Sequence, residues 1–131
     1  MASLGMTIDE LIEKTSTDPE SVEFSDVINL IDNTYHYTPT RFHNGIGSKA
    51  VINEAGTNEG SCKIFAFGKL NNLSEKQTLA CFGEYYREDV LGHPENDDHA
   101  NIRNFMMHGW EGIEFVGEAL TPMSSHPVDY Y

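Results

Sequence analysis

A chain of 131 residues with 39% hydrophobic residues suits one ordinary domain that can bury its own core. Eight Lys and Arg against 21 Asp and Glu give a formal net charge of -13, which repels nucleic-acid phosphates and anionic membranes, so we expect neither partner. No stretch is long and apolar enough to span a bilayer, and the N-terminus lacks the pattern of a secretory signal. These features favour a cytoplasmic protein.

The first half of the chain predicts two helices followed by a hairpin. In MTIDELIEKT, Thr7 and Glu10 form a capping-box pattern that predicts a short helix. In FSDVINLIDNTY, apolar residues recur every three or four positions, which predicts an amphipathic helix with Ser25 as its N-cap. Residues 36–53 lose this period and contain glycines between two extended-looking arms, which indicates a loose β-hairpin.

The central segment, SCKIFAFGKL at residues 61–70, is compatible with a helix or a strand. Its apolar run is too short and too continuous for periodicity to decide, and we favour a helix that begins near Ser61. The next helix is better marked, because Ser74 and Gln77 form a second capping box and an apolar stripe continues to Val90.

The last third predicts one more helix and one short strand. The helix is expected over residues 97–110, with Asp97 or Asp98 as its cap and Met106 among the residues that face the core. The strand is expected over residues 113–116.

These elements predict an α+β fold, a mainly helical single domain in which several helices pack on a small antiparallel sheet. We expect residues 1–5 to form a flexible N-terminus, residues 6–122 the folded domain, and residues 123–131 a flexible C-terminal tail.

Four long runs of the sequence resemble one bacterial family. YTPTRFHNG, NEAGTNEGSCKIFAFGKL, TLACFGEYYREDVLGHP and NIRNFMMHGWEGIEFVGEALTP, in this order, are similar to the HopJ family of type III effector proteins, and the resemblance covers roughly residues 6–122. The resemblance implies secretion by a type III system as an alternative to a cytoplasmic location, and it supplies no catalytic residues. The capped helix near Thr7 argues against an unfolded export signal at the N-terminus.

Cys62 is the candidate nucleophile, because it lies in the first turn of the helix predicted near Ser61. The helix dipole there would lower its pKa, and His99 or His108 would serve as the base of a thiol-dependent enzyme. The alternative is that Cys62 is a small buried hydrophobe, which is how most free cysteines behave. We favour the second interpretation, so the enzyme is not the first hypothesis.

A ligand cleft between the glycine-rich loop and one polar helix face is the first hypothesis. The candidate ligand-binding residues are Asn53, Glu54, Asn58, Glu59, Asn101, Arg103 and Asn104. The alternative is that the loop residues cap a helix and build turns, and that the helix residues form an ordinary solvated surface. On the first hypothesis, the protein binds a protein or a small molecule whose identity the sequence does not indicate.

A metal site is a third interpretation that the spacing does not support. Cys62, Cys81, His93 and His99 have suitable ligand atoms, but their separations match none of the paired patterns of structural zinc sites. Carboxylates at Glu54, Glu59, Glu84 or Asp89 offer the chemistry of an iron or manganese site without the spacing. We therefore predict no metal ligands, and the sequence indicates neither a cofactor nor an oligomeric state.

Overall fold

The structure is a computed structural model that describes residues 6–123, in which helices surround a central helix and two small sheets. The helices are α1 (Ile8–Thr17), α2 (Phe24–Thr34), α3 (Glu59–Leu70), α4 (Glu75–Ala80) and α5 (Ala100–His108), with short helical turns η1 (Pro19–Ser21), η2 (Gly47–Lys49), η3 (Tyr85–Val90) and η4 (Gly109–Gly112). The strands are β1 (Tyr35–Tyr37), β2 (Phe42–Asn44), β3 (Val51–Asn53), β4 (Ile113–Phe115) and β5 (Leu120–Pro122).

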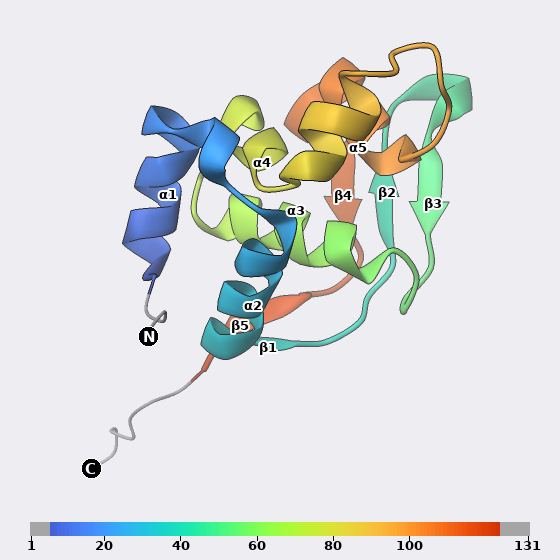
Figure 1. Ribbon diagram of the computed structural model, residues 1–131. Coiled ribbons are helices and arrows are strands. Elements are labelled where there is room, and N and C mark those ends of the chain that lie inside the picture. The colour runs from blue at the N-terminus through green and yellow to red at the C-terminus, as the bar shows by residue number, and fades with distance from the viewer. Residues whose placement is uncertain (1–5, 124–131) are drawn as a thin grey trace.

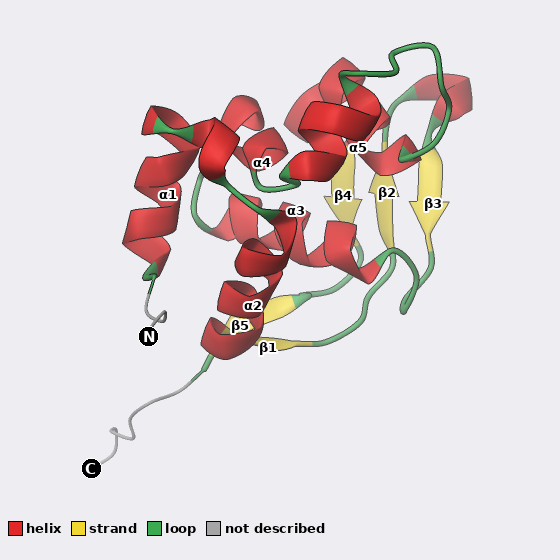
Figure 2. Ribbon diagram, in the orientation of Figure 1, coloured by secondary structure: helices red, strands yellow, loops and turns green. Residues whose placement is uncertain are grey.

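The helices and strands form the α+β fold that the sequence predicts. Helix α3 runs across the middle of the molecule, with α1 and α4 towards one side and a three-stranded sheet towards the other (Figure 1). There are two antiparallel sheets where we expected one, because β1 and β5 pair separately from β3, β2 and β4 (Figure 2). The predicted flexible ends lie outside the described residues, except for Met123, whose N–H donates to the Thr34 carbonyl at 3.2 Å.

Both capping boxes form as predicted. Thr7 Oγ1 accepts the Glu10 N–H at 3.1 Å while the Thr7 N–H donates to Glu10 Oε1 at 2.9 Å. Ser74 and Gln77 repeat the arrangement with two bonds of 3.0 Å at the start of α4. Each box satisfies two backbone donors that the helix itself leaves free, which is why these local patterns fix helix starts.

Two other helix starts differ from the prediction. Ser25 is not the N-cap of α2; Glu23 occupies that position, and the Phe24 N–H donates to Glu84 Oε1 from a distant part of the chain at 3.2 Å. Helix α5 begins at Ala100 with His99 as its N-cap at φ 53°, and not at Asp97 or Asp98. At α2 this tertiary contact overrides the local preference for a Ser cap, and at α5 the Asp98 side chain accepts a hydrogen bond from Arg103 instead of capping the helix.

Residues 61–70 are helical, within α3, which settles the ambiguity of that segment. The helix begins two residues earlier than expected, after Asn58, which adopts a left-handed conformation at φ 49°. The side chains of Ile64, Phe65 and Phe67 are completely buried, so the helix is covered on several sides. A helix covered in this way has no polar stripe, which explains why its sequence shows no clear period.

The helix predicted from Ser74 to Val90 is interrupted. Helix α4 ends at Ala80, and the chain continues through a turn into η3, a π-helical segment. Gly83 in the turn has φ +60°, and a Cβ atom there would lie 2.5 Å from the Phe24 backbone nitrogen. The close approach of the two chain segments therefore requires glycine and breaks the helix.

The predicted hairpin and the predicted strand belong to one sheet. Strands β2 and β3 form the hairpin with η2 in the connection, and β4 pairs with the other edge of β2, with Phe42 opposite both Asn53 and Phe115. The pairing brings residues near 113 beside residues near 44, and α5 packs against β2 just before the chain enters β4. The hairpin and α5 are thereby held side by side.

Candidate functional site

Five asparagines meet where the hairpin, α3 and α5 come together, and we call them the asparagine network: Asn44 of β2, Asn53 of β3, Asn58 before α3, and Asn101 and Asn104 of α5. Asn44 Nδ2 donates to Asn101 Oδ1 at 2.9 Å and to the Asn101 carbonyl at 2.8 Å. Asn101 Nδ2 donates to Asn53 Oδ1 at 2.9 Å, and Asn53 Nδ2 donates back to Asn101 Oδ1 at 3.1 Å. Asn58 Nδ2 also donates to Asn53 Oδ1, at 2.7 Å.

The network extends to the backbone of the hairpin. Asn104 Nδ2 donates to the carbonyls of Asn44 and Lys49, at 3.1 and 3.0 Å, so one side chain bridges a strand and the turn beyond it. All members except Asn58 are buried, and buried amides that lose their partners are costly. Within residues 6–123, Asn44 Oδ1 is the buried side-chain atom that has no hydrogen-bond partner. The network therefore fixes α5 against the hairpin.

The loop and the helix face that we expected to form a cleft are brought together by this network. A cavity of about 360 Å³, here called the α3–α5 cavity, opens beside it between the first turns of the two helices. Its lining comprises Phe24, Val51, Asn58, Gly60, Ser61, Phe82, Tyr85, His99, Ala100, Asn101 and Ile102. A Cβ atom on Gly60 would lie 2.7 Å from Phe24 Cζ, so glycine lets the Phe24 ring form this wall.

Of the predicted binding residues, only Asn58 and Asn101 line the α3–α5 cavity. Asn53 and Asn104 are buried in the network. Glu54 pairs with Arg41 at 3.0 Å on the surface, and Glu59 accepts a hydrogen bond from the Tyr37 hydroxyl at 3.0 Å. The loop residues thus divide between structural and surface roles, and the sequence offered no signal for this division.

His99 is held at the edge of the cavity by a carboxylate and an aromatic ring. Its Nε2 lies 3.0 Å from Asp89 Oδ2, and its ring centroid lies 5.5 Å from that of Tyr85. Asp98 Oδ2 is 4.0 Å from the same nitrogen, and the hydrogen bond from Arg103 keeps the pKa of Asp98 below its usual range. The imidazole is oriented by its carboxylate partner in the way that a base or a hydrogen-bonding group requires.

Cys62 is placed differently from the thiol of the enzyme hypothesis. It is buried, it is absent from the lining of the α3–α5 cavity, and its sulfur lies 4.0 Å from the Thr40 carbonyl. Cys62 is thus the buried hydrophobe of the favoured interpretation, and burial raises its pKa, where the enzyme hypothesis needs a lowered one. Its N–H already donates to the Asn58 carbonyl at 3.0 Å, which removes it from the free donors of the helix start.

No hydrogen bond joins Cys62 to His99 or His108 in the described part of the chain. His99 is bound to Asp89, and His108 lies in the last turn of α5, two turns beyond the cavity. The set of Cys62, His99 and His108 therefore stays a prediction without geometric support.

Arg103 and Asn104 line a second and larger hollow of about 620 Å³, the α5 groove, on the other side of α5. It shares Val51 and Ala100 with the α3–α5 cavity and also includes Met106, which we expected in the core but which is 43% exposed. Sequence reasoning missed this groove, although two adjacent methionines after a helix start are a signal that one apolar side chain must face outward.

Two further properties concern metals and membranes. Among residues 6–123, no three His, Cys, Asp or Glu side chains gather closely enough to hold a metal ion, so Cys62, Cys81, His93 and His99 do not meet as a group. Over the same residues, no helix has the length and apolar character that crossing a bilayer requires.

Comparisons with known proteins agree with the resemblance seen in the sequence. The profile of the HopJ type III effector protein family matches residues 8–120, which is most of the chain. This chain belongs to the HopJ family. The sequence is also 49% identical to that of VPA0580, a protein of unknown function whose crystal structure is solved. The two structures match with a TM-score of 0.84, over 93% of this chain and 100% of the VPA0580 chain. No curated protein is significantly similar to this HopJ chain.

Proposed function

We propose that this HopJ protein is a binding domain that takes up a small planar ligand with hydrogen-bonding groups in the α3–α5 cavity. One observation carries the proposal: the glycine-rich loop and the start of α5, which are about 40 residues apart in sequence, converge on one hollow lined by both. A volume of about 360 Å³ is at the small end of the range for ligand pockets.

The lining supplies both stacking surfaces and polar groups. Phe24 and Tyr85 pack edge to face at 4.9 Å, and the His99 ring lies beyond Tyr85. The same lining includes Asn58 and Ser61, which offer an amide and a hydroxyl group. Planar ligands favour such aromatic walls, while a few polar groups fix their orientation.

Binding is favoured over covalent chemistry by the state of the thiols. Cys62 and Cys81 are both buried, and burial raises the pKa of each, to about 12 for Cys81. A thiol that stays protonated at neutral pH is a poor nucleophile. We therefore propose that the protein acts through binding. Export by a type III system from the cytoplasm of the producing bacterium is proposed on family membership alone, and, because the capping box at Thr7 starts a folded helix, any export signal would have to precede that helix.

The test is ligand mapping by NMR with a panel of small heteroaromatic compounds on ¹⁵N-labelled protein. We expect the amides of Ser61, Tyr85 and His99 to shift together, with weak affinity for fragments, on the order of 1 mM. Ser61→Leu fills the cavity and should abolish these shifts. Ser61 makes no side-chain hydrogen bond within residues 6–123 and lies in a helix where Leu is favourable, so the fold should persist.

Ser48→Leu is the matched control, because Ser48 is exposed in η2 and lines neither hollow. This variant should bind the same compounds as the unmodified protein. The proposal fails if no compound of the panel shifts these amides, or if the shifts survive in Ser61→Leu.

A further inference from the structure

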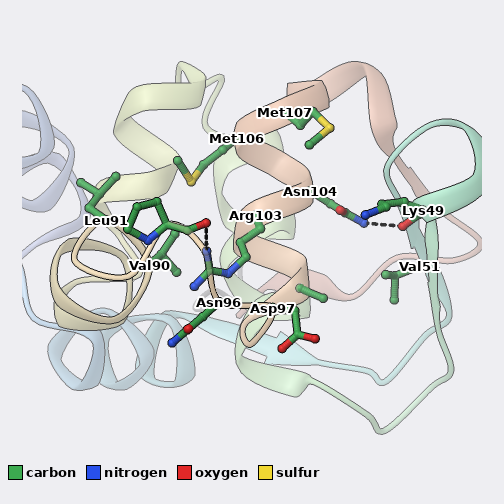
Figure 3. Close-up of a pocket in the computed structure, with 12 residues that line it drawn as sticks. Lys49, Val51, Val90, Leu91, Asn96, Asp97, Arg103, Asn104, Met106 and Met107 are labelled. Carbon is green, nitrogen blue, oxygen red and sulfur yellow. Dashed lines mark hydrogen bonds between the residues drawn. The ribbon is translucent and has the colours of Figure 1, made fainter.

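The α5 groove is a second surface that the proposed small-ligand site does not use. It is bounded by the end of η3 and the loop after it on one side, by the outer face of α5, and by Lys49 and Val51 of the hairpin on the other (Figure 3). The lining residues are Lys49, Val51, Val90, Leu91, Pro94, Asn96, Asp97, Ala100, Arg103, Asn104, Met106 and Met107. At about 620 Å³ it is the larger of the two hollows.

Exposed apolar side chains line this groove. Leu91 is 49% exposed and Met107 is 68% exposed, and Met106 lies between them along the α5 face. Contiguous exposed apolar side chains rimmed by polar groups mark interaction sites in soluble proteins. Methionine suits such a site because its unbranched, polarizable side chain adapts to the surface that it meets.

The loop that bounds one side of the groove is acidic, whereas Lys49 lies on the opposite side. Residues 88–98 contain Glu88, Asp89, Glu95, Asp97 and Asp98 and no Lys or Arg. Four of these carboxylates are exposed, and Asp89 is the half-buried partner of His99. With Asp89 bound to His99 and Asp98 to Arg103, the carboxylates of Glu88, Glu95 and Asp97 remain to present negative charge next to the apolar surface. This side of the groove therefore favours a cationic partner.

Arg103 neutralises one of these carboxylates, Asp98, and its guanidinium is held within the acidic loop. Its Nη2 donates to Asp98 Oδ1 at 2.7 Å and to the His93 carbonyl at 3.1 Å, while Nε donates to the Asp98 carbonyl at 2.6 Å. These bonds tie the acidic loop to α5. The groove wall is thus preformed, which lowers the ordering cost of binding.

We propose that the α5 groove docks an exposed segment of a partner protein that presents apolar side chains beside Lys or Arg. The apolar side chains would pack on Leu91, Met106 and Met107, and the cationic ones would face Glu95 and Asp97. A second copy of this chain fits less well, because each copy carries a net charge of -13. The proposal is independent of the ligand in the α3–α5 cavity.

The probe is a fluorescein-labelled 14-residue peptide with Leu at helical spacing and Lys at the other positions, followed by fluorescence anisotropy. Two matched peptides replace either every Lys by Glu or every Leu by Ala, and both should lose binding. The double substitution Leu91→Ser with Met107→Ser should weaken binding of the Lys and Leu peptide about tenfold. Both side chains are largely exposed, so the fold should persist, and thermal melting checks this.

Val116→Ser is the control, because Val116 is 70% exposed and lies outside the groove. A direct readout comes from methyl-labelled methionine. The Met106 and Met107 methyl signals should shift when the peptide is added, while those of Met6 and Met123 should not. This comparison separates groove binding from general attraction to an acidic protein.

Three results would overturn the proposal. The first is equal affinity for the Lys and Glu peptides, and the second is methyl shifts that spare Met106 and Met107. The third is self-association in sedimentation that the Leu91→Ser, Met107→Ser protein loses, since the occupant would then be a second copy. Ser61→Leu should leave peptide binding unchanged, so the two sites can fail separately.

Discussion

The core around α3 and four of the five asparagines of the network are buried, yet different forces hold the two regions. Around α3, the Phe65 ring lies within about 5 to 6.5 Å of the rings of Phe42, Phe82, Phe105 and Trp110. Such packing is strong but tolerates small rearrangements, because dispersion has little directionality. In the network, each amide needs a partner at one distance and angle, so one arrangement of α5 against the hairpin is selected.

Both hollows lie beside the network, and Phe82 of the core also lines the α3–α5 cavity. The α3–α5 cavity and the α5 groove are both bounded by α5 and Val51, which the network holds together. Apolar packing supplies the stability of the fold, while the hydrogen bonds of the network supply the geometry of the surfaces that we propose to bind partners.

The largest effect should follow from removing the ring at the centre of the core. Phe65→Ala should lower the free energy of unfolding by about 3–5 kcal/mol, because it removes a fully buried ring and leaves a cavity. Urea denaturation followed by circular dichroism measures this. Val116→Ala on the surface should change the same quantity by less than about 0.5 kcal/mol. A loss for Phe65→Ala no larger than that of the control would contradict the packing described for α3.

Removing an amide from the network should cost less stability than removing the Phe65 ring, but it should disturb the position of α5 more. Asn101→Ala removes the amide that joins Asn44 and Asn53, and it should cost about 1–3 kcal/mol. Because α5 then loses its lateral bonds to the hairpin, the amide signals of residues 99–104 should broaden or shift more than those of α3.

The exposed Asn96 provides the matched substitution, since its side chain makes no hydrogen bond within residues 6–123. Asn96→Ala should leave both stability and the α5 signals unchanged. If Asn101→Ala also leaves the signals of α5 in place, the network is not what positions that helix.

Features that depend on neighbours in sequence were predicted well. The capping boxes at Thr7 and Ser74 each need only four consecutive residues, and both form. The HopJ resemblance was also recognised from the sequence, and the family comparison confirms it. Four members of the network were singled out as polar candidates, but Asn44 was not among them.

The features that were missed depend on contacts distant in sequence. Asn44 bonds to Asn101 across 57 positions, and the start of α2 is bound by Glu84 across 60. The favoured interpretation of Cys62 as a buried residue is confirmed, and the lowered pKa that the enzyme hypothesis needs is absent because burial, which the tertiary fold sets, outweighs a helix end. The roles of Asn53 and Asn104 as buried structural groups could not be separated from ligand binding for the same reason.

The smallest effect on stability at neutral pH is expected from the two cysteines, whose surroundings differ. Cys81 lies in the apolar core, where burial raises its pKa from 9.0 to about 12, while Cys62 has the polar neighbours Tyr37 and Thr40. At pH 7 both thiols are protonated in the folded and unfolded states, so neither contributes a pH dependence to stability. Alkylation with iodoacetamide, followed by mass spectrometry, should therefore label both only as fast as the protein opens.

Above pH 9 the sign of the effect on stability is fixed by the raised pKa. The unfolded chain loses the Cys81 proton near pH 9 while the folded protein keeps it until about pH 12, so stability should fall across this window. Cys81→Ala should reduce that fall, to which the raised pKa of Cys62 contributes in the same direction, without altering the pH dependence of stability below pH 9. Rapid labelling of Cys62 near pH 7 in the folded protein would instead require a thiolate that the buried site disfavours, and it would restore the thiol-enzyme hypothesis over the binding domain proposed above.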